Sequence, residues 1–475
     1  MQLPSLSPET FAQKLSDPTV ALKFAYLNDL LLNSEYCLIE FMVRKGAWKW
    51  PIPPKPPGYD TGNKTIELGV ILFLLNNTGY IADNDIRQYA QYLKGALGLP
   101  NSQLPVQAYA WIMNNVLIYD DGGVISGGKY DTYDQGWFAA FLNLIITDMH
   151  DAWYGFPQGS PAPIKLDFSV SNYTITLGMI GDWGTGDTTA KAVLRQLTTL
   201  NPNYLIHLGD TYYSGSPATG QWAGYYFHPG EEMENLVNMW PGTSTPRSFT
   251  LNSNHEMYTG GNGYFGEALK TTGPFSLQKG MSYFALQAGD WTVLGLDSGY
   301  YGSSFDAFMD GSIGGEFLDR EQINWIAGLN LNPAKTIVLT HHTGFQYDAS
   351  AFMKLWDQVN GALGADPYAW YWGHVHNGIV YASPLTLPGT DGNLQSTSTY
   401  ARCLGHAALP YGEASALINN PSVEWMETDK QANGLMLNGF ATLTFQLDGQ
   451  LMVTGIRESF YHLGTSSPVF SKRIF

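Results

Sequence analysis

The stretch YTITLGMIGDWG at residues 173–184 decides the fold class. Its first eight residues are rich in β-branched and apolar side chains, which favours a buried strand that ends at Gly181-Asp182. The apolar run at residues 204–208 repeats this arrangement and ends at Gly209-Asp210. Between the two runs, residues 190–200 have helical periodicity. This strand–helix–strand order predicts an α/β fold whose functional loops follow the strands.

Further runs extend the same pattern toward the C-terminus. Residues 292–296 and 336–340 read as strands, and residues 439–447 and 450–458 read as a hairpin closed by Asp448-Gly449. The segment between these elements, about residues 382–434, is long and weakly patterned. We expect it to be an insertion, because a loop of that length is usually functional or disordered.

The chain divides near residue 165 into two predicted domains. Residues 1–165 show mostly helical patterns, and the stretch GFPQGSPAP at residues 155–163 has the composition of a linker. Residues 166–475 contain the strand–helix alternation. The function of the N-terminal helical domain is not indicated by its sequence.

Charge and composition narrow the possible functions. There are 24 Lys and Arg residues against 41 Asp and Glu residues, a net charge of −17. Nucleic-acid binding is therefore not expected, because it requires basic surfaces. The longest apolar runs are too short to cross a membrane, and the N-terminal sequence lacks a leader pattern, so we expect a cytoplasmic protein without a membrane partner. Two cysteines, Cys37 and Cys403, exclude a disulfide framework and allow at most one bridge.

Five short polar segments follow predicted strands or lie in loops, and together they indicate a metal site. Each alone is weak evidence, since a glycine–aspartate pair most often marks a turn. Together they supply carboxylate, amide and imidazole ligands, the mixture used for Fe, Mn or Zn. No thiolate cluster accompanies them, so a structural zinc site is not expected. The segments are Gly181-Asp182-Trp183-Gly184, Gly209-Asp210-Thr211-Tyr212-Tyr213, Asn254-His255-Glu256, Thr340-His341-His342 and Gly373-His374-Val375-His376.

The order of these motifs resembles the calcineurin-like metallophosphoesterase superfamily, and within it the purple acid phosphatase branch. The general superfamily has a histidine two residues after its first aspartate, whereas this chain has Gly184 there. The purple branch has a tyrosine three residues after its second aspartate, and Tyr213 occupies that position after Asp210. The resemblance implies a β-sandwich flanked by helices and hydrolysis of phosphate esters by two metal ions.

The resemblance also implies a role for each motif residue. Asp210 bridges two metals, typically Fe(III) in the first site and Fe(II), Zn or Mn in the second. His255 contacts the substrate and helps protonate the leaving group. Ser253 replaces the usual glycine and fits only if its φ is not strongly positive. The implied ligands of the first site, besides Asp210, are Asp182, Tyr213 and His376, and those of the second are Asn254, His341 and His374.

Two further residues each have two interpretations, and one acidic run has a simple structural interpretation. His342 contacts the substrate or hydrogen-bonds to a metal ligand. Arg402 clamps a phosphate in bidentate fashion or serves as a structural residue. The acidic run at residues 231–234 is most simply an exposed helix face.

The function that we expect is metal-dependent hydrolysis of a small phosphate ester, with monoesters favoured. The alternatives are a phosphodiesterase or pyrophosphohydrolase on the same centre, and a catalytically silent binding protein. Residues 1–165 are a candidate docking or oligomerisation module, which allows a homo-oligomer.

Overall fold

The computed structural model describes residues 152–475, except 242–246, 305–306, 316–319, 411–413 and 433, together with isolated residues between 130 and 151. The chain forms two compact units, Met1–Asp151 and Ala152–Phe475. The predicted helices of residues 1–118 lie outside the described residues. The helical character of residues 1–165 and the boundary at residue 165 therefore stay predictions. Among the described residues, every helix is too short or too polar to cross a membrane.

A six-stranded sheet forms one layer of the Ala152–Phe475 unit. The three strands at one side, β2, β3 and β4, are parallel, and β14 is antiparallel to β2. The predicted hairpin is confirmed as β14 and β15. In spatial order the strands are β16 (Phe470–Arg473), β15 (Val453–His462), β14 (Gly439–Leu447), β2 (Thr174–Ile180), β3 (Tyr204–His207) and β4 (Arg247–Thr250).

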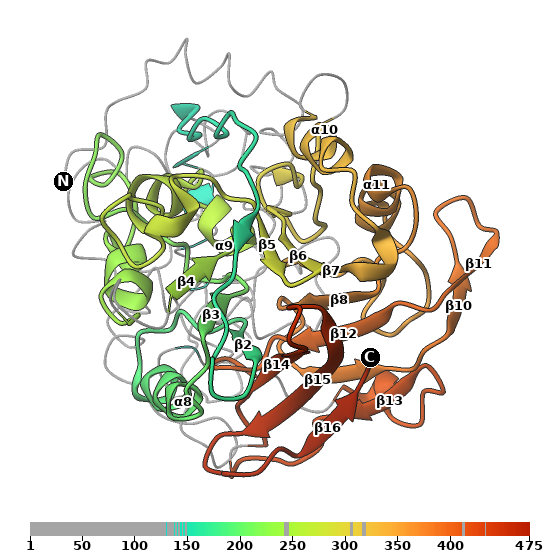
Figure 1. Cartoon of the computed structure of the whole chain (residues 1–475). Helices are drawn as coiled ribbons and strands as arrows, with labels where there is room; N and C mark the ends of the chain where they lie inside the picture. Colours follow the sequence, from blue (N-terminus) through green and yellow to red (C-terminus); the bar gives the residue numbers. More distant parts are fainter. Residues whose placement is uncertain are drawn as a thin grey trace, which may run out of the picture. The chain divides into compact units, whose positions relative to one another are not determined.

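An eight-stranded mixed sheet forms the second layer (Figure 1). Its central strands β6, β7, β8 and β12 run parallel to one another. A separate hairpin consists of β10 (Leu385–Pro388) and β11 (Leu394–Thr397). In spatial order the strands are β1 (Ile164–Lys165), β5 (Phe284–Ala288), β6 (Trp291–Gly295), β7 (Thr336–Leu339), β8 (Ala369–Trp372), β12 (Tyr400–Leu404), β9 (Gly378–Tyr381) and β13 (Val423–Met426).

The two sheets pack face to face because their strands alternate between two apolar layers. In β7, Ile337 and Leu339 join the core shared with the six-stranded sheet, whereas Val338 joins a second core with the helices. Tyr371 and Trp370 of β8 alternate in the same way. This arrangement confirms the predicted α/β sandwich flanked by helices.

Helices cover the outer faces of the sheets. Buried residues of α10 (Glu321–Gly328) and α11 (Lys354–Leu363) pack on the eight-stranded sheet, and the two helices lie beside β6–β8 in Figure 1. The helix α8 (Thr188–Thr199) follows β2 and begins at Asp187, whose carboxylate accepts a hydrogen bond from the backbone N–H of Ala190 at 2.8 Å. Shorter helical segments are Glu232–Val237, α9 (Asn254–Met257), Tyr264–Ala268, Ser276–Gln278, Pro333–Lys335 and Ser415–Leu417.

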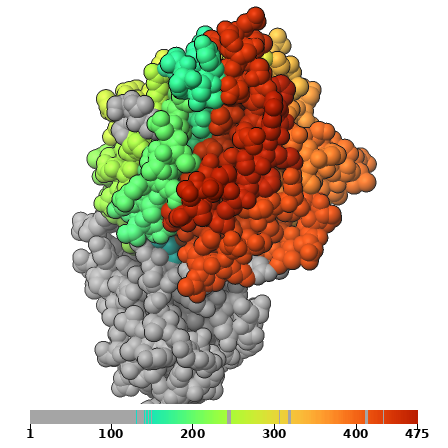
Figure 2. All heavy atoms as spheres, turned by 60° about the horizontal axis from the view of Figure 1, so that its bottom comes forward, coloured from blue at the N-terminus to red at the C-terminus, as the bar shows by residue number. Residues whose placement is uncertain are grey.

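Residues 382–434, which are weakly patterned in the sequence, form regular structure, and their assignment as an insertion stays a prediction. They contain β10 to β13, and β12 lies inside the eight-stranded sheet between β8 and β9. Their pattern is hard to recognise because the buried strand β12, with sequence YARCL, contains a charged residue. Figure 2 shows the C-terminal segment (red) on the surface between the green segment near residue 200 and the orange segment near residue 400.

Arg402 is structural, which corrects its assignment as a possible phosphate clamp. It is fully buried, and its Nε and Nη2 atoms donate to the carboxylate of Glu458 on β15 at 2.7–3.0 Å. Its Nη1 donates to the carbonyl oxygens of Tyr381 and Ala401 at 3.0 and 2.9 Å. The hydroxyl of Tyr371 donates to the same carboxylate at 2.8 Å. The ion pair therefore links the two sheets, and all three guanidinium nitrogens have protein partners.

Replacing Arg402 by Met would leave the Glu458 carboxylate buried without its cation. We expect the free energy of unfolding, measured by urea denaturation, to fall by about 3–5 kcal/mol, with much of it regained in the double variant Arg402→Met/Glu458→Gln. The control is Arg247→Met, which breaks the exposed pair of Arg247 and Asp167 and should cost less than about 1 kcal/mol. Equal losses in the two single variants would contradict this account.

Candidate metal centre

The predicted ligands converge where the carboxyl ends of strands from both sheets meet. Asp182, Asp210 and Asn254 follow β2, β3 and β4 of the six-stranded sheet. His341 follows β7 and His374 follows β8 of the other sheet, and His376 lies two residues further on. Because parallel strands present their carboxyl ends at one edge, the sandwich gathers these loops at one place.

The first group of ligands contains Asp182, Asp210 and His376. The His376 Nε2 atom lies 3.0 Å from Asp182 Oδ1 and 3.9 Å from Asp210 Oδ2. The Tyr212 hydroxyl donates to Asp210 Oδ2 at 2.7 Å and lies 3.0 Å from the same His376 Nε2. Two carboxylates, one imidazole and one phenol thus surround one point, which is a donor set suited to an iron, manganese or zinc ion.

Tyr212, the residue before the predicted Tyr213, brings its hydroxyl to this group. The backbone N–H of Tyr212 donates to Gly184 O at 2.8 Å, which places this residue beside the loop that carries Asp182. The backbone of Tyr213 is held elsewhere, because its N–H donates to Glu231 Oε1 at 2.8 Å and its carbonyl accepts from His255 Nδ1 at 2.5 Å. Spacing along the sequence did not reveal which of two adjacent rings points inward.

The second group contains Asn254, His341 and His374. His341 Nδ1 must be the protonated nitrogen, because it lies 2.9 Å from the carbonyl oxygen of Leu208. Its Nε2 atom then faces Asn254 Oδ1 at 2.9 Å and Asp210 Oδ1 at 3.2 Å. Three acceptors at these distances repel one another unless a cation lies among them. The arrangement therefore fits a metal ion.

Asp210 is shared by the two groups. Its Oδ1 faces His341, and its Oδ2 faces Tyr212 and His376. Burial opposes its ionisation, but His341 and His255 hold the pKa of Asp210 well below its usual range. Burial, together with the charge of Asp210, raises the pKa of Asp182 to about 6. One carboxylate that serves two sites is the arrangement required to hold two cations close together.

Histidines are the ion-pair partners of both aspartates among the described residues. Asp182 and Asp210 are almost completely buried, at 0% and 1% exposure. Burying two carboxylates so close together costs considerable free energy unless positive charge compensates them. The site therefore fits divalent or trivalent cations.

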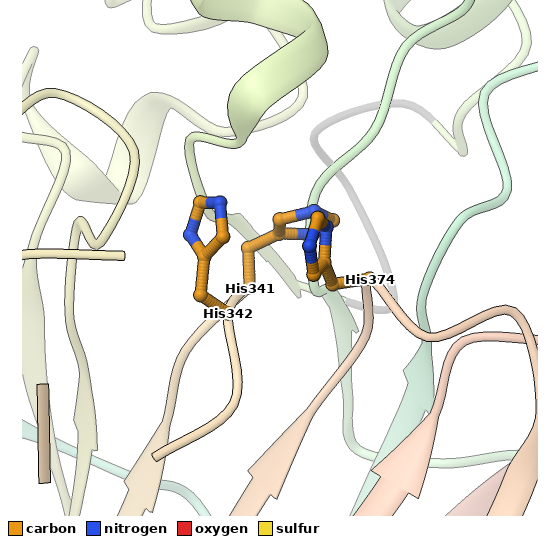
Figure 3. Close-up of side chains that lie close together, drawn as sticks. All are labelled: His341, His342 and His374. Carbon is orange, nitrogen blue, oxygen red and sulfur yellow. The ribbon is translucent and has the colours of Figure 1, made fainter. Parts of the chain in front are cut away.

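His342 lies beside the second group, and one of its nitrogens is within 4.8 Å of nitrogens of His341 and His374. Its Nε2 donates to Phe308 O at 2.8 Å, and its Nδ1 lies 2.9 Å from the hydroxyl of Ser298. Its ring centroid is 4.7 Å from that of His374. Figure 3 shows His341, His342 and His374 close together, and the ring centroid of His341 lies 4.9 and 5.1 Å from those of His342 and His374. Both nitrogens have protein partners, which favours a hydrogen-bonding role for His342 over contact with the substrate.

His255 lies at the border of the centre. Its Nε2 atom is 3.9 Å from Asp210 Oδ2, and its side chain is 11% exposed. Because Nδ1 donates to the carbonyl of Tyr213, the ring orientation is fixed with Nε2 on the side of the aspartate. Burial lowers the pKa of His255.

Ser253 accommodates the turn because its backbone is extended, with φ −138° and ψ −178°. Its hydroxyl donates to Asp210 Oδ1 at 2.5 Å and lies against Glu256 Oε2. Burial and the charge of Asp210 raise the pKa of Glu256 to about 8, so that Glu256 keeps a proton that it donates to Ser253. The serine that departs from the family motif thus supports the shared carboxylate.

Four of the ligand residues have left-handed backbone conformations. The φ angles of Asp182, Asp210, His374 and His376 are 55°, 78°, 65° and 29°. Non-glycine residues adopt such angles at a free-energy cost, and they persist where the surrounding structure enforces them. A Cβ on Gly373 would lie 2.5 Å from Asp182 Oδ2, so the loop after β8 requires a glycine there.

Sequence reasoning missed the supporting acids. Glu231 and Glu232 are 7% and 0% exposed, so the run at residues 231–234 is not an exposed face. Glu231 accepts hydrogen bonds from the backbone N–H groups of Tyr213 and Ser214 at 2.8 and 2.9 Å. The motif Ser253-x-x-Glu256, which resembles a helix capping box, was the available signal for Glu256.

Residues 143–378 match the family model of the calcineurin-like phosphoesterases. This part of the chain is a calcineurin-like phosphoesterase domain. It is accordingly a metal-dependent phosphoric ester hydrolase, and the family centre contains two metals. No curated protein matches the chain in sequence.

Three solved structures are similar to the chain at low identity. The inner-membrane-complex anchor GAP50 of Plasmodium has a TM-score of 0.41 and 8% identity, and the match covers 63% of this chain and 88% of that one. PhoD has a TM-score of 0.37 and 11% identity, with 66% and 73% covered. A 5'-nucleotidase precursor from Thermus thermophilus has a TM-score of 0.29 and 12% identity, with 61% and 55% covered. Likenesses at this level do not establish a shared substrate.

Replacing Tyr212 by Phe removes a hydroxyl from the first group. We expect the metal content per chain, measured by elemental analysis after dialysis, to fall, with affinity reduced at least about 10–100-fold, the range found for residues that support metal ligands. The matched control is Tyr213→Phe, which should retain its metal. The opposite result, with loss only in Tyr213→Phe, would show that the family position and not the observed hydroxyl binds the metal.

Replacing Ser253 by Ala removes the hydrogen bond to Asp210 Oδ1. We expect metal affinity in a chelator competition to weaken about 10–100-fold, because the shared carboxylate loses its orienting donor. Ser459→Ala is the control, since the Ser459 hydroxyl on β15 lies 3.0 Å from that of Ser471 and serves the sheet. Unchanged affinity in Ser253→Ala would exclude the supporting role of Ser253.

Proposed function

We propose that the protein hydrolyses phosphomonoesters with a dinuclear centre of the purple acid phosphatase type. The observation that carries this proposal is the position of Asp210, whose two oxygens face separate groups of ligands. The phenol in the first group supports a ferric ion, with tyrosinate from Tyr212 in place of the predicted Tyr213. The neutral amide and the two imidazoles of the second group suit Fe(II), Zn or Mn.

When bound, the two metals supply the positive charge that holds a phosphoryl group and the nucleophile for in-line displacement. The chain's own residues complete the reaction. We assign His255 as the group that donates a proton to the leaving-group oxygen. The hydrogen bond from Nδ1 to Tyr213 O keeps Nε2 directed toward the centre.

The neutral ligand Asn254 limits the negative charge of the second site. Its Nδ2 donates to the hydroxyl of Tyr258 at 3.1 Å, which leaves Oδ1 facing His341. A third carboxylate at this position would weaken the attraction for a phosphate ester. Because Arg402 is paired with Glu458, we infer that the metals, and not this arginine, capture the phosphate.

Phosphodiesters and pyrophosphates are the alternative substrates on the same centre. A single non-bridging charge on the diester makes it bind two cations less strongly than a monoester dianion does. We therefore favour monoesters. The docking or oligomerisation role of residues 1–165 and the cytoplasmic location stay predictions.

The purified protein should hydrolyse p-nitrophenyl phosphate faster than bis(p-nitrophenyl) phosphate. Removing the metals with a chelator should abolish both rates, and adding iron with zinc or manganese should restore them. A visible absorption band that disappears in Tyr212→Phe is expected for a ferric tyrosinate. A higher rate on the diester would reject the monoesterase proposal, and a colourless active di-zinc protein would reject the ferric site while retaining the hydrolase.

A further inference from the structure

A separate group of metal-binding side chains lies where β13 and β15 end. Glu427 directly follows β13 and Asp429 comes two residues later, whereas His462 is the last residue of β15. One ligand atom from each of these three residues lies within 4.8 Å of the others. Because β13 belongs to the eight-stranded sheet and β15 to the six-stranded one, the group joins the two sheets. It shares no residue with the dinuclear centre.

The two buried residues of this group present polar atoms without hydrogen bonds. Glu427 and His462 are 1% and 6% exposed. Glu427 Oε2 and His462 Nε2 point at each other, and among the described residues neither atom has a hydrogen-bond partner. Native proteins satisfy nearly all of their buried polar atoms, and an exception is commonly explained by a bound ion or water. The pair therefore indicates that a ligand belongs beside these two atoms.

Asp429 completes the group from the solvent side. Its backbone N–H donates to Glu427 Oε1 at 2.8 Å, which turns the chain back toward β15. Its Oδ2 atom lies 3.9 Å from His462 Nδ1, and its side chain is 71% exposed. The imidazole thus has a carboxylate on each side. Since a neutral imidazole has a single N–H, one of its nitrogens directs a lone pair at an anion, and a cation turns this repulsion into coordination.

Backbone hydrogen bonds hold all three residues in place independently of a ligand. The backbone N–H of Glu427 donates to Gly378 O on β9 at 2.8 Å. The carbonyl of Asp429 accepts from the backbone N–H of Leu437 at 2.9 Å. The carbonyl of His462 accepts from Gln196 Nε2 on α8 at 2.8 Å. The site is therefore preorganised, which lowers the cost of binding an ion.

We propose that Glu427, Asp429 and His462 bind a zinc ion that links the end of β13 to the end of β15. Two carboxylate oxygens and one imidazole nitrogen suit zinc, whereas calcium and magnesium prefer ligands that are all oxygen. Zinc–ligand distances are about 2.0–2.2 Å, so binding requires a small rotation of the Glu427 carboxylate away from Nε2. The exposed side of Asp429 gives the ion access from solvent and leaves room for water as a further ligand.

Asp429→Asn is the most direct test, because this side chain is exposed and its replacement should not disturb the fold. After loading with zinc and dialysis, elemental analysis should find one zinc fewer per chain than in the wild type. A chelator competition should show the affinity of this site weakened at least about tenfold, and His462→Gln should lose the same ion. The control is Glu424→Gln on β13, three residues before Glu427, whose carboxylate pairs with Lys472 and which should keep all its zinc. Equal zinc contents in the wild type and Asp429→Asn would overturn the proposal.

A second measurement separates this site from the dinuclear centre, which also accepts zinc in the proposed function. Asp210→Asn removes the shared ligand of that centre. Relative to Asp210→Asn, the double variant Asp210→Asn/Asp429→Asn should hold one zinc fewer and gain less in melting temperature when zinc is added. If this difference is found but the wild type hydrolyses no ester, the proposed function fails while the zinc site stands. If the two variants respond equally to zinc, His462 pairs with the two carboxylates as a protonated base and the zinc site is rejected.

Discussion

Two carboxylates, Asp182 and Asp210, lie almost without solvent in a site where imidazoles are their ion-pair partners among the described residues. Burying like charges this close together is unfavourable, as the raised pKa of Asp182 shows. Protonation would relieve the repulsion but would remove the ligands. Metal cations relieve the repulsion and leave the carboxylates as ligands. The surrounding loops are therefore best understood as keeping oxygen and nitrogen donors directed at two cations.

The sandwich meets this requirement by joining two sets of parallel strand ends. The six-stranded sheet contributes the acidic, phenolic and amide donors, and the eight-stranded sheet contributes the three imidazoles. The loops that bear them are short, which forces several ligand residues into left-handed conformations. The cost of these conformations is offset by the packed sheets on either side and by ties between loops, such as the hydrogen bond from the backbone N–H of His374 to Asp182 Oδ2 at 2.7 Å. The rigid sheets therefore hold the ligand atoms precisely in place at the centre.

Much of this could be predicted from the sequence, because strands with β-branched residues and glycine-ended turns are local patterns. The predicted strands at residues 173–180, 204–208 and 336–340 match β2, β3 and β7 to within one residue at each end. Side-chain direction was less predictable. Tyr212 and Tyr213 are adjacent, and the hydrogen bond from Tyr212 N to Gly184 O, which connects residues 28 positions apart, places the first of them at the aspartates. The role of Arg402 was equally hard to predict, because its buried partner Glu458 is 56 residues away in the sequence.

The position of Arg402 also changes how the charge of the protein should be understood. An arginine in a loop near a phosphate site would share the work of binding the anion, but this one is fully occupied between the sheets. A strongly acidic chain then has to attract an anionic substrate through its metals. The donor set of the second site keeps negative charge low, because its amide and imidazole ligands carry no negative charge. The trivalent and divalent ions that we propose would bring more positive charge than two carboxylates and one phenolate remove. With the proposed metals the centre would be locally positive in an acidic chain, and binding of phosphate would depend on the loaded metals.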